Sequence, residues 1–413
     1  WSLDNFGNKL IATIFNGESF EWDSDPTTAN TTRATIITGA PTGSRFSLIS
    51  TPDRHLIFFG TETTIGTKSS QDEMFIRFSS QEDINTYTPT AANTAGTQRL
   101  SDGSRIVGAL RGRDSIYVWT DTALFTMRFV GPPFTFSFQQ VGTNCGLIGK
   151  NAAVEVDGTA YWMSENGFFR YSGRLESLPC LVEDHVFDDI NTIPKQHITA
   201  GLNNLFGEIM WFYPNSGSGT VNRMVAYNYL DSSSERPVWT TGTLARTAWR
   251  DSAVFGKPHA TEYDASGTTA TTNKDHVIGC TDGTSTYFEH ETGLNQIKEG
   301  AISAIAASIE SGDFDIGSQG LQGDGEFMMK IRRVIPDFLA QTGDARITLN
   351  LRDFPNDTAA SSTLGPFTVT SGTQKIDTRA RARSVSLKID NTSTDQFWKL
   401  GTFRLDIQPD GRR

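Results

Sequence analysis

The stretch AAVEVDGTAYWMSENGFFRY, residues 152–171, carries the clearest information about the fold. Three short runs of apolar, β-branched and aromatic residues are separated by Asp157-Gly158 and Asn166-Gly167. These dipeptides favour the tight turns of antiparallel hairpins, because Asn, Asp and Gly accept a left-handed backbone at low cost. The stretch therefore predicts three consecutive strands, the larger part of a four-stranded propeller blade.

Similar units occur before and after this stretch. Residues 10–22 hold two β-rich runs around Asn16-Gly17, residues 208–229 hold two more, and residues 276–289 hold two around Asp282-Gly283. Several units carry a late aromatic residue, namely Trp22, Trp119, Trp162 and Trp211. A recurrence of roughly 40–50 residues is typical of a β-propeller. We predict an all-β chain with a distorted propeller of five to seven blades, six favoured, over residues 1–299. A pair of stacked sandwiches is the alternative.

The pattern changes after about residue 300. Apolar residues alternate with basic or polar ones at 328–336, 345–352, 384–389 and 398–407, as in strands with one buried face. These strands predict a separate antiparallel β-sandwich-like domain over residues 300–413.

Two other segments are distinctive. In residues 181–190, Val182, Val186 and Ile190 fall on one helical face, so a short helix is expected there. Residues 299–309 combine helical and alternating spacings, and we predict a strand.

The charge is unevenly distributed. The net charge is −11, yet residues 330–413 hold 14 Lys and Arg against 9 Asp and Glu, a net of +5. The rest of the chain holds 22 basic and 38 acidic residues, a net of −16. An acidic body argues against tight, general nucleic-acid binding, and it is compatible with a surface that repels phosphate.

No pattern of a reactive site is present. Cys145, Cys180 and Cys280 lie far apart without a CxxC pair, so reduced thiols are expected rather than a disulfide framework or a zinc ribbon. The six histidines lack HExxH or paired metal spacing. We predict no catalytic, cofactor-binding or metal-binding residues. No apolar run approaches the roughly 18 residues of a membrane-spanning helix.

The enzyme alternative is a propeller that cleaves carbohydrate, which requires two carboxylates facing across a cleft. The close acid pairs are Asp23/Asp25, Asp188/Asp189 and Asp313/Asp315. The Asp-box turn of propeller glycosidases is absent, and residues 164–168 have only its outline without the defining Asp. These features favour a protein that is not an enzyme.

The sharpest local feature is TRARARS, residues 378–384. On a strand, Arg379, Arg381 and Arg383 project from one face, about 6.6 Å between neighbours. Such a row repels itself unless it meets carboxylates or phosphates. The alternatives are a salt-bridged subunit interface, a solvated edge that prevents strand pairing, and a DNA contact. We predict that the row contacts a neighbouring subunit or an adaptor protein.

Several stretches together resemble the tail hub or nozzle family of short-tailed bacteriophages, of the phage-stabilisation and tail tubular protein B type. The stretches are 1–13, 144–146, 161–173, 207–214, 244–248, 289–293, 334–337, 379–383 and 398–413. Members of that family usually have further sequence before the part that matches residues 1–13.

The resemblance implies a propeller-bearing virion protein, made in the host cytoplasm, that forms a homo-oligomeric ring, six-fold in the family. Its partners would be a portal-adaptor protein and tail fibres or spikes, and double-stranded DNA would pass through transiently. The body's negative charge would then keep phosphates from the channel wall, within about 8 Å in physiological salt. A carbohydrate-binding propeller for host recognition and a tail or fibre adaptor off the DNA path remain the alternatives.

Overall fold

The chain folds into antiparallel β-sheets in two compact units. The computed structural model describes residues 1–23, 27, 32–264, 277–280, 283–298, 300–317, 320–321, 327–354 and 359–411. The first unit comprises Trp1–Ala270 and Ile278–His290, and the second comprises Thr271–Val277 and Glu291–Arg413. The predicted boundary at 299/300 thus lies within the second unit.

In its described residues, the first unit is a series of six four-stranded sheets, here called blades 1 to 6. In blades 1 to 5 the strands pair in chain order, and in blade 6 the order is β21-β22-β24-β23. The strands of blades 1 to 3 are β1 Ser2–Phe6, β2 Lys9–Thr13, β3 Ser19–Asp23, β4 Thr35–Ile36, β5 Phe46–Ser50, β6 His55–Phe59, β7 Phe75–Phe78, β8 Gly96–Arg99, β9 Ile106–Arg111, β10 Ile116–Thr120, β11 Ala123–Gly131 and β12 Thr135–Thr143. Those of blades 4 to 6 are β13 Ala153–Val156, β14 Thr159–Ser164, β15 Gly167–Tyr171, β16 Leu175–Ser177, β17 Thr199–Asn203, β18 Glu208–Tyr213, β19 Arg223–Asn228, β20 Trp239–Gly242, β21 Ala248–Arg250, β22 His259–Asp264, β23 Val277–Cys280 and β24 Gly283–Glu289.

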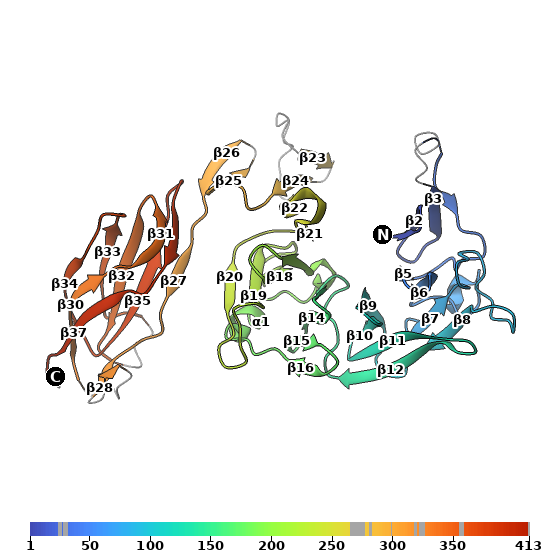
Figure 1. The fold of residues 1–413 in the computed structure, drawn as a ribbon, viewed down its shortest axis with the longest axis horizontal. Helices are drawn as coiled ribbons and strands as arrows, with labels where there is room; N and C mark the ends of the chain where they lie inside the picture. The colour runs from blue at the N-terminus through green and yellow to red at the C-terminus, as the bar shows by residue number, and fades with distance from the viewer. Residues whose placement is uncertain are drawn as a thin grey trace. The chain divides into compact units, whose positions relative to one another are not determined.

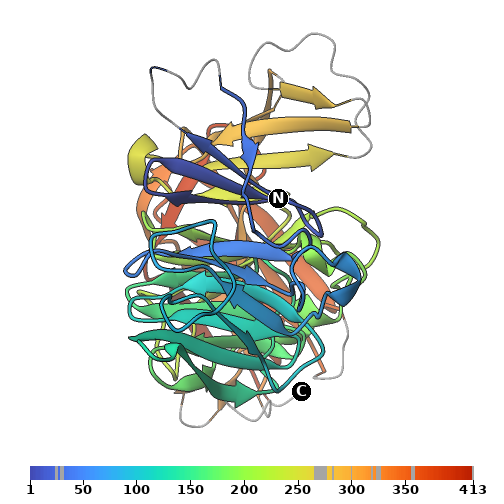
Figure 2. The ribbon, with the colours of Figure 1, turned by 90° about the vertical axis from the view of Figure 1, so that its right-hand side faces the viewer.

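The blades are arranged as in a propeller. First strands of neighbouring blades contact one another at four places: β1 with β5, β9 with β13, β13 with β17, and β17 with β21. Later strands of a blade therefore lie progressively further out, as the run from β9 to β12 shows in Figure 1. Figure 2 looks onto the first three blades, which follow one another from dark blue to teal. The predicted all-β propeller is confirmed, with the favoured six blades.

Local turn chemistry explains where the hairpins form. Asn16 and Asp157 adopt φ of 53° and 51°, and Gly158 adopts 82°, which is the backbone that the Asn-Gly and Asp-Gly dipeptides favour. β2 pairs with β3 and β13 with β14 across these turns. The predicted Asp282-Gly283 turn includes Asp282, which lies outside the described residues.

Large aromatic side chains fill the spaces between blades. Trp119, Trp162 and Trp211 occupy the second strands of blades 3, 4 and 5 and are fully buried. The indole Nε1 of Trp162 donates to the carbonyl oxygen of Cys145 at 2.8 Å, and that of Trp211 donates to Ala152 at 3.0 Å. Both acceptors precede β13, so each indole ties its strand to a segment next to the preceding blade. Trp22 differs, because it lies in the third strand of blade 1 and is only partly buried.

The second unit is mainly a two-layer sandwich. One sheet has the order β27-β35-β32-β33 and the other the order β34-β30-β37, which the pair β31-β36 accompanies. The unit's strands are β25 Asn295–Lys298, β26 Ala301–Ala304, β27 Ser308–Glu310, β28 Ile316–Gly317, β29 Gly320–Leu321, β30 Met329–Ile335, β31 Phe338–Thr342, β32 Ala345–Arg352, β33 Ser362–Val369, β34 Ile376–Ala382, β35 Ser384–Asp390, β36 Phe397–Leu400 and β37 Arg404–Pro409. The core between the sheets is aliphatic, with Ile331, Leu349 and Ile389 fully buried. The predicted sandwich is confirmed.

The two distinctive segments are partly as predicted. An α-helix, α1, covers Glu183–Phe187 within the predicted 181–190, and Val186 is its buried residue. The N-cap residue, Val182, provides no side-chain hydrogen bond to the first turn of α1. The absence of this stabilisation is consistent with a helix of only 5 residues. The predicted strand over 299–309 is two strands, β26 and β27, in different sheets. Within the described part of the chain, no helix has the length and apolar character needed to cross a membrane.

Candidate functional site

The predicted arginine row lies on the outer side of the sheet β34-β30-β37. Strand β34 alternates strictly at this point, because Ala380 and Ala382 are fully buried while Arg379 and Arg381 are exposed. Ala380 and Ala382 pack into the core of the sandwich. Small inward residues and long outward cations are what period-2 alternation demands of a strand with one buried face. Arg379 and Arg381 therefore share a face, as predicted.

Arg383 leaves the row, and this part of the prediction is wrong. Strand β34 ends at Ala382, and β35 begins at Ser384 in the other sheet. The backbone N–H of Arg383 donates to the carbonyl oxygen of Arg352 at 3.1 Å, so the chain is crossing between the two sheets at this residue. The alternation seen in the sequence cannot show that the strand changes sheets.

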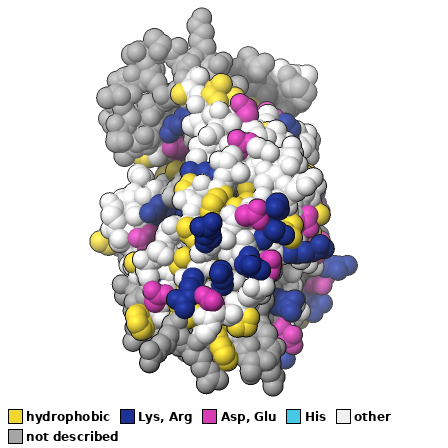
Figure 3. All heavy atoms as spheres, turned by 90° about the vertical axis from the view of Figure 1, so that its left-hand side faces the viewer, with side chains coloured by type: hydrophobic (Ala, Val, Ile, Leu, Met, Phe, Trp, Pro, Cys, Tyr) yellow, Lys and Arg dark blue, Asp and Glu magenta, His cyan; other side chains and the backbone are white. Residues whose placement is uncertain are grey.

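Three further cations of the neighbouring strand join Arg379 and Arg381. Lys330, Arg332 and Arg333 of β30 line the same hollow, together with Asp377, Asp406 and Asp410; its volume is about 600 Å³. We call this set of five cations and three carboxylates the basic face. Viewed from the side where β34, β30 and β37 lie, Lys and Arg gather there with fewer acidic side chains among them (Figure 3).

A β-bulge brings two consecutive arginines of β30 to this face. The register of β30 shifts between Ile331 and Arg333 against both β34 and β37. Ile331 and Val334 point into the core, so two residues, Arg332 and Arg333, stand between two buried ones. The hydroxyl of Thr378 donates to the carbonyl oxygen of Ile331 at 2.6 Å and so satisfies it beside the bulge.

The carboxylates neutralise only part of the basic face. Arg333 pairs with Asp377 at 2.9 Å and Arg381 with Asp410 at 2.7 Å. Hydrogen bonds from Arg333 and then Lys375 lower the pKa of Asp377. Lys330, directly opposite Arg381 in the register, has no carboxylate within 4.0 Å among the described residues.

Arg332 and Arg379 likewise have no carboxylate within 4.0 Å in the part of the chain that the structure describes. Like charges directly opposite one another on a sheet are destabilising. A bound anion would reduce this repulsion between the cations of the basic face. Arg guanidinium groups bind carboxylates and phosphates through paired hydrogen bonds. The basic face can therefore receive acidic side chains or phosphate groups.

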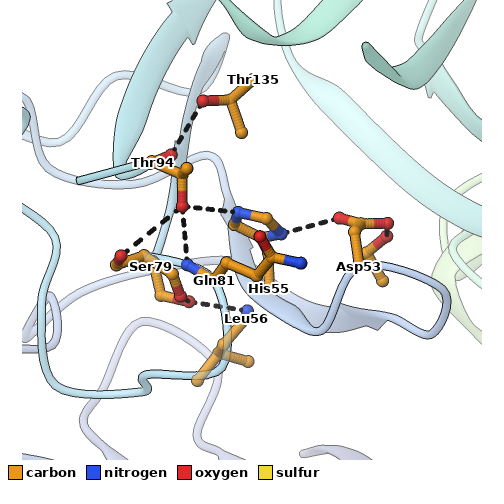
Figure 4. Close-up of polar contacts among 9 residues, drawn as sticks. Asp53, His55, Leu56, Ser79, Gln81, Thr94 and Thr135 are labelled. Carbon is orange, nitrogen blue, oxygen red and sulfur yellow. Dashed lines mark hydrogen bonds and ion pairs between the residues drawn. The ribbon is translucent and has the colours of Figure 1, made fainter. Parts of the chain in front are cut away.

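A second polar cluster has the connectivity of a catalytic triad. The ring of His55 is fully buried; its Nδ1 lies 2.7 Å from Asp53 Oδ2, and its Nε2 lies 3.1 Å from Thr94 Oγ1 (Figure 4). Because a carboxylate only accepts, Nδ1 carries a hydrogen, and in a neutral ring Nε2 accepts from the Thr94 hydroxyl. This is the order of groups that activates a hydroxyl nucleophile.

The surroundings of this cluster indicate a structural role. Thr94 Oγ1 also accepts a hydrogen bond from the Gln81 backbone N–H at 2.7 Å, and Thr94 O accepts one from Thr135 Oγ1 at 3.0 Å. A cavity of about 350 Å³ is lined by Asp53 but not by Thr94. The hydroxyl thus already donates to His55 and accepts from Gln81, and Thr94 does not line this cavity. The network instead joins blade 2 to the start of β12 in blade 3 (Figure 4).

A third cluster surrounds a buried arginine at blade 6. Arg246 Nε donates to His290 Nε2 at 2.8 Å, and its Nη1 lies 3.2 Å from Glu262 Oε2. Its guanidinium also lies 3.9 Å from the centre of the Phe288 ring. Burial lowers the pKa of Arg246 to about 10. The pKa of His290 is lowered to about 4, mainly by burial and secondly by the positive charge of Arg246. His290 is therefore neutral at neutral pH and acts as an acceptor that positions a buried cation.

Two of the carboxylates considered for hydrolysis form ion pairs with arginines instead. Asp189 pairs with Arg223 at 3.4 Å, and Asp313 pairs with Arg352 at 3.0 Å. Asp25 and His276 lie outside the described residues. Among the residues that the structure does describe, no group of three or more His, Cys, Asp or Glu side chains could hold a metal ion. Cys145 and Cys180 are free, and burial raises the pKa of each thiol to about 11.

Sequence reasoning missed Lys330, Arg332 and Arg333 as parts of the candidate site. Their strand was recognisably basic, but only the bulge and the pairing with β34 place all three beside Arg379 and Arg381. It also missed the contact between Arg246 and His290. Two of the stretches that carry the family resemblance, 244–248 and 289–293, meet through this hydrogen bond.

Comparisons with known proteins assign no function to the chain. No protein-family model matches the chain, and no curated protein matches it in sequence. Among solved structures, AztD from Citrobacter koseri has 10% identity and a TM-score of 0.30, with 57% of this chain and 73% of that one covered. An exo-β-1,3-galactanase from Phanerochaete chrysosporium has 10% identity and a TM-score of 0.29, with 96% and 94% covered. AofleA from Arthrobotrys oligospora, in a mutant form, has 11% identity and a TM-score of 0.34, with 71% and 86% covered.

Proposed function

We propose that the protein is a structural subunit of a bacteriophage tail, a hub or nozzle that forms a ring around the DNA channel and is not an enzyme. The observation that carries this proposal is the basic face. Lys330, Arg332 and Arg379 gather around a hollow of about 600 Å³ without carboxylate partners among the described residues. A neighbouring subunit or adaptor that brings acidic side chains would complete this surface.

The geometry of the basic face favours a protein partner over a solvated edge. Strand β34 is an edge strand of its sheet, and a few lysines would suffice to prevent edge pairing. Here the cations instead come from two strands and line a hollow, and a bulge adds one more. Arg is also enriched at protein interfaces, where its planar group is less costly to desolvate than an ammonium.

Exposed apolar side chains support an assembly role as well. In the first unit, Val254 is 92% exposed and Ile193 88% exposed, and in the second unit Leu339 is 68% exposed. Single exposed apolar residues are ordinary on a protein surface, but the most exposed ones are natural contacts for other subunits. The resemblance to tail hub proteins supplies the kind of assembly: a ring that meets a portal-adaptor protein and fibres.

The net charge distribution fits passage of DNA past the body rather than binding to it. Residues outside 330–413 carry a net charge of −16. If acidic residues of this body face the channel, they repel phosphates near the wall, so that DNA slides without being held. The basic face would then bind protein partners rather than DNA.

The test is charge reversal on the basic face. The Arg379→Glu/Arg381→Glu variant should stay folded but fail to form rings, alone or with the portal-adaptor protein, in light-scattering measurements. Lys399→Glu is the matched control, since Lys399 is an exposed cation of β36 outside the hollow, and it should assemble normally. Normal assembly of the double variant would refute the role of the basic face.

Two further measurements separate the alternatives. The chain of 413 residues at 150 mM salt should not retard double-stranded DNA in a gel. Retardation that the double variant abolishes would assign the basic face to nucleic acid. Incubation with host polysaccharide should leave its chain length unchanged. Shortened chains would instead establish a carbohydrate-cleaving enzyme.

A further inference from the structure

A pocket opens where the inner strands of four successive blades begin. Its volume is about 470 Å³. Phe46 starts β5 and Ile106 starts β9, while Lys150 precedes β13 and Lys195 precedes β17. Because the first strands β9, β13 and β17 contact one another in turn, this pocket lies at one end of the row that these inner strands form. We call it the axial pocket.

The wall of the axial pocket is largely apolar. Phe46, Ile106, Val107 and Ile148 line it, and the ring of Phe46 is stacked on Phe59 with centroids 4.8 Å apart. Rings and branched side chains held by the blades present a firm surface to a flat apolar group. A volume of this size falls in the range of roughly 300–1,000 Å³ that small-molecule sites occupy.

Lys150, which has no carboxylate partner among the described residues, is part of this wall. The ammonium of Lys150 lies 5.3 Å from the centre of the Phe46 ring. The side chain is half-buried, and burial lowers the pKa of its ammonium. Within the described residues it has no carboxylate within 4.0 Å. The contact with the aromatic ring offsets only part of the cost of removing this cation from water. A bound anion would offset more of it.

The other cations of the axial pocket differ in whether a carboxylate of the protein already neutralises them. Arg45 makes a two-pronged ion pair with Glu73, and Lys195 pairs with Glu165. Arg105 is exposed and has no carboxylate within 4.0 Å among the described residues. Among the residues that the structure describes, Lys150 and Arg105 are therefore the two cations of the pocket without a carboxylate partner.

We infer that the axial pocket binds a small organic anion whose apolar, preferably aromatic, body lies against Phe46, Ile106 and Ile148 and whose charged group contacts Lys150. This function goes beyond the proposed role in assembly. A polymer such as DNA would not fit the pocket, whereas a carboxylate or a phosphate monoester on a ring system fits its volume, its apolar wall and its charge.

The test uses three probes that share one ring system: naphthalene-2-carboxylate, 2-naphthyl phosphate and neutral naphthalene-2-methanol. Isothermal titration of the full chain should show at least one of the two anions binding at least tenfold more tightly than the neutral probe. Which anion is preferred identifies the charged group. Equal affinity for all three probes, or binding of none of them, would overturn the inference.

Three variants locate the binding. Lys150→Met should weaken binding of the preferred anion at least tenfold, and Lys399→Met, which alters an exposed lysine of the second unit, should leave it unchanged. Ile193→Asp covers the case in which Lys150→Met does not fold, because Ile193 lines the axial pocket yet is 88% exposed. Its new carboxylate should repel the anion and weaken binding severalfold. Unchanged affinity in a folded Lys150→Met, or failing that in Ile193→Asp, would contradict the assignment.

Discussion

Both units consist of antiparallel sheets, but their most distinctive side chains differ in location. Those of the first unit are buried, whereas those of the second are on the surface. In the first unit three tryptophans, Trp119, Trp162 and Trp211, are fully buried between blades. In the sandwich, small residues such as Ala380 lie inside, and the long cations lie outside. The distinctive feature of the first unit is thus its aromatic interior, and that of the second is its charged surface.

The physical reason lies in the space that each architecture must fill. Blades diverge outward from their inner strands, so wide gaps open between neighbouring sheets, and an indole ring fills such a gap. Its N–H can also reach a backbone oxygen across it, as Trp162 does with Cys145 and Trp211 with Ala152. Two sheets of a sandwich pack about 10 Å apart, and branched aliphatic side chains fill that layer without polar atoms.

The largest effect is expected from removing an indole between blades. Trp211→Ala should destabilise the first unit by about 4 kcal/mol, because a fully buried aromatic side chain leaves a cavity and Ala152 loses its hydrogen-bond donor. Hydrogen exchange read out by mass spectrometry reports the two units separately. Faster exchange should be confined to the blades; equal acceleration in the sandwich would break the comparison.

A smaller loss is expected in the aliphatic core. Leu349 is fully buried in the sandwich, and Leu349→Ala should lower the free energy of unfolding of that unit by about 3 kcal/mol. The blades should keep their exchange rates. Leu339→Ala is the matched control, because Leu339 is 68% exposed and its replacement should change stability by less than about 0.5 kcal/mol.

Acid should weaken the first unit through His290. Its pKa falls from 6.5 in the unfolded chain to about 4 in the folded protein, so between these values the unfolded chain binds more protons. The contribution is complete above pH 6.5 and is lost as the pH falls toward 4. Between pH 7.5 and 5 the loss should be ~2 kcal/mol. His290→Gln keeps an acceptor for Arg246, and urea titrations should show a smaller loss than in the wild type; an identical pH dependence would contradict the assignment.

The smallest effect on stability belongs to the basic face. Arg379→Glu/Arg381→Glu should change the free energy of unfolding by less than about 1 kcal/mol, since exposed ion pairs contribute little. Thermal melting of the monomer measures this change. A loss of unfolding free energy as large as that of Leu349→Ala would mean that these arginines stabilise the sandwich. It would contradict the assignment of the basic face as a surface for partners.

Local sequence was sufficient for most of the fold and for part of the site. Asn16-Gly17 and Asp157-Gly158 marked hairpins because their backbone preferences act within a few residues. The alternation around Arg379 and Arg381 placed both on one face because side chains of a strand point to opposite sides in turn. The helix at 181–190 was overestimated, because spacing alone does not show the absence of an N-terminal cap.

By itself, then, the sequence determined the all-β class, the blades, the sandwich and the outward pair Arg379 and Arg381, since these depend on short-range turn preferences and on the alternation of side chains. Only the tertiary structure decided that Arg383 leaves the face, that a bulge adds Arg333 to it beside Arg332, and that Lys150 lies against Phe46. These features depend on strand pairing and on contacts between residues far apart in the chain. No local pattern encodes which distant segments will pack together.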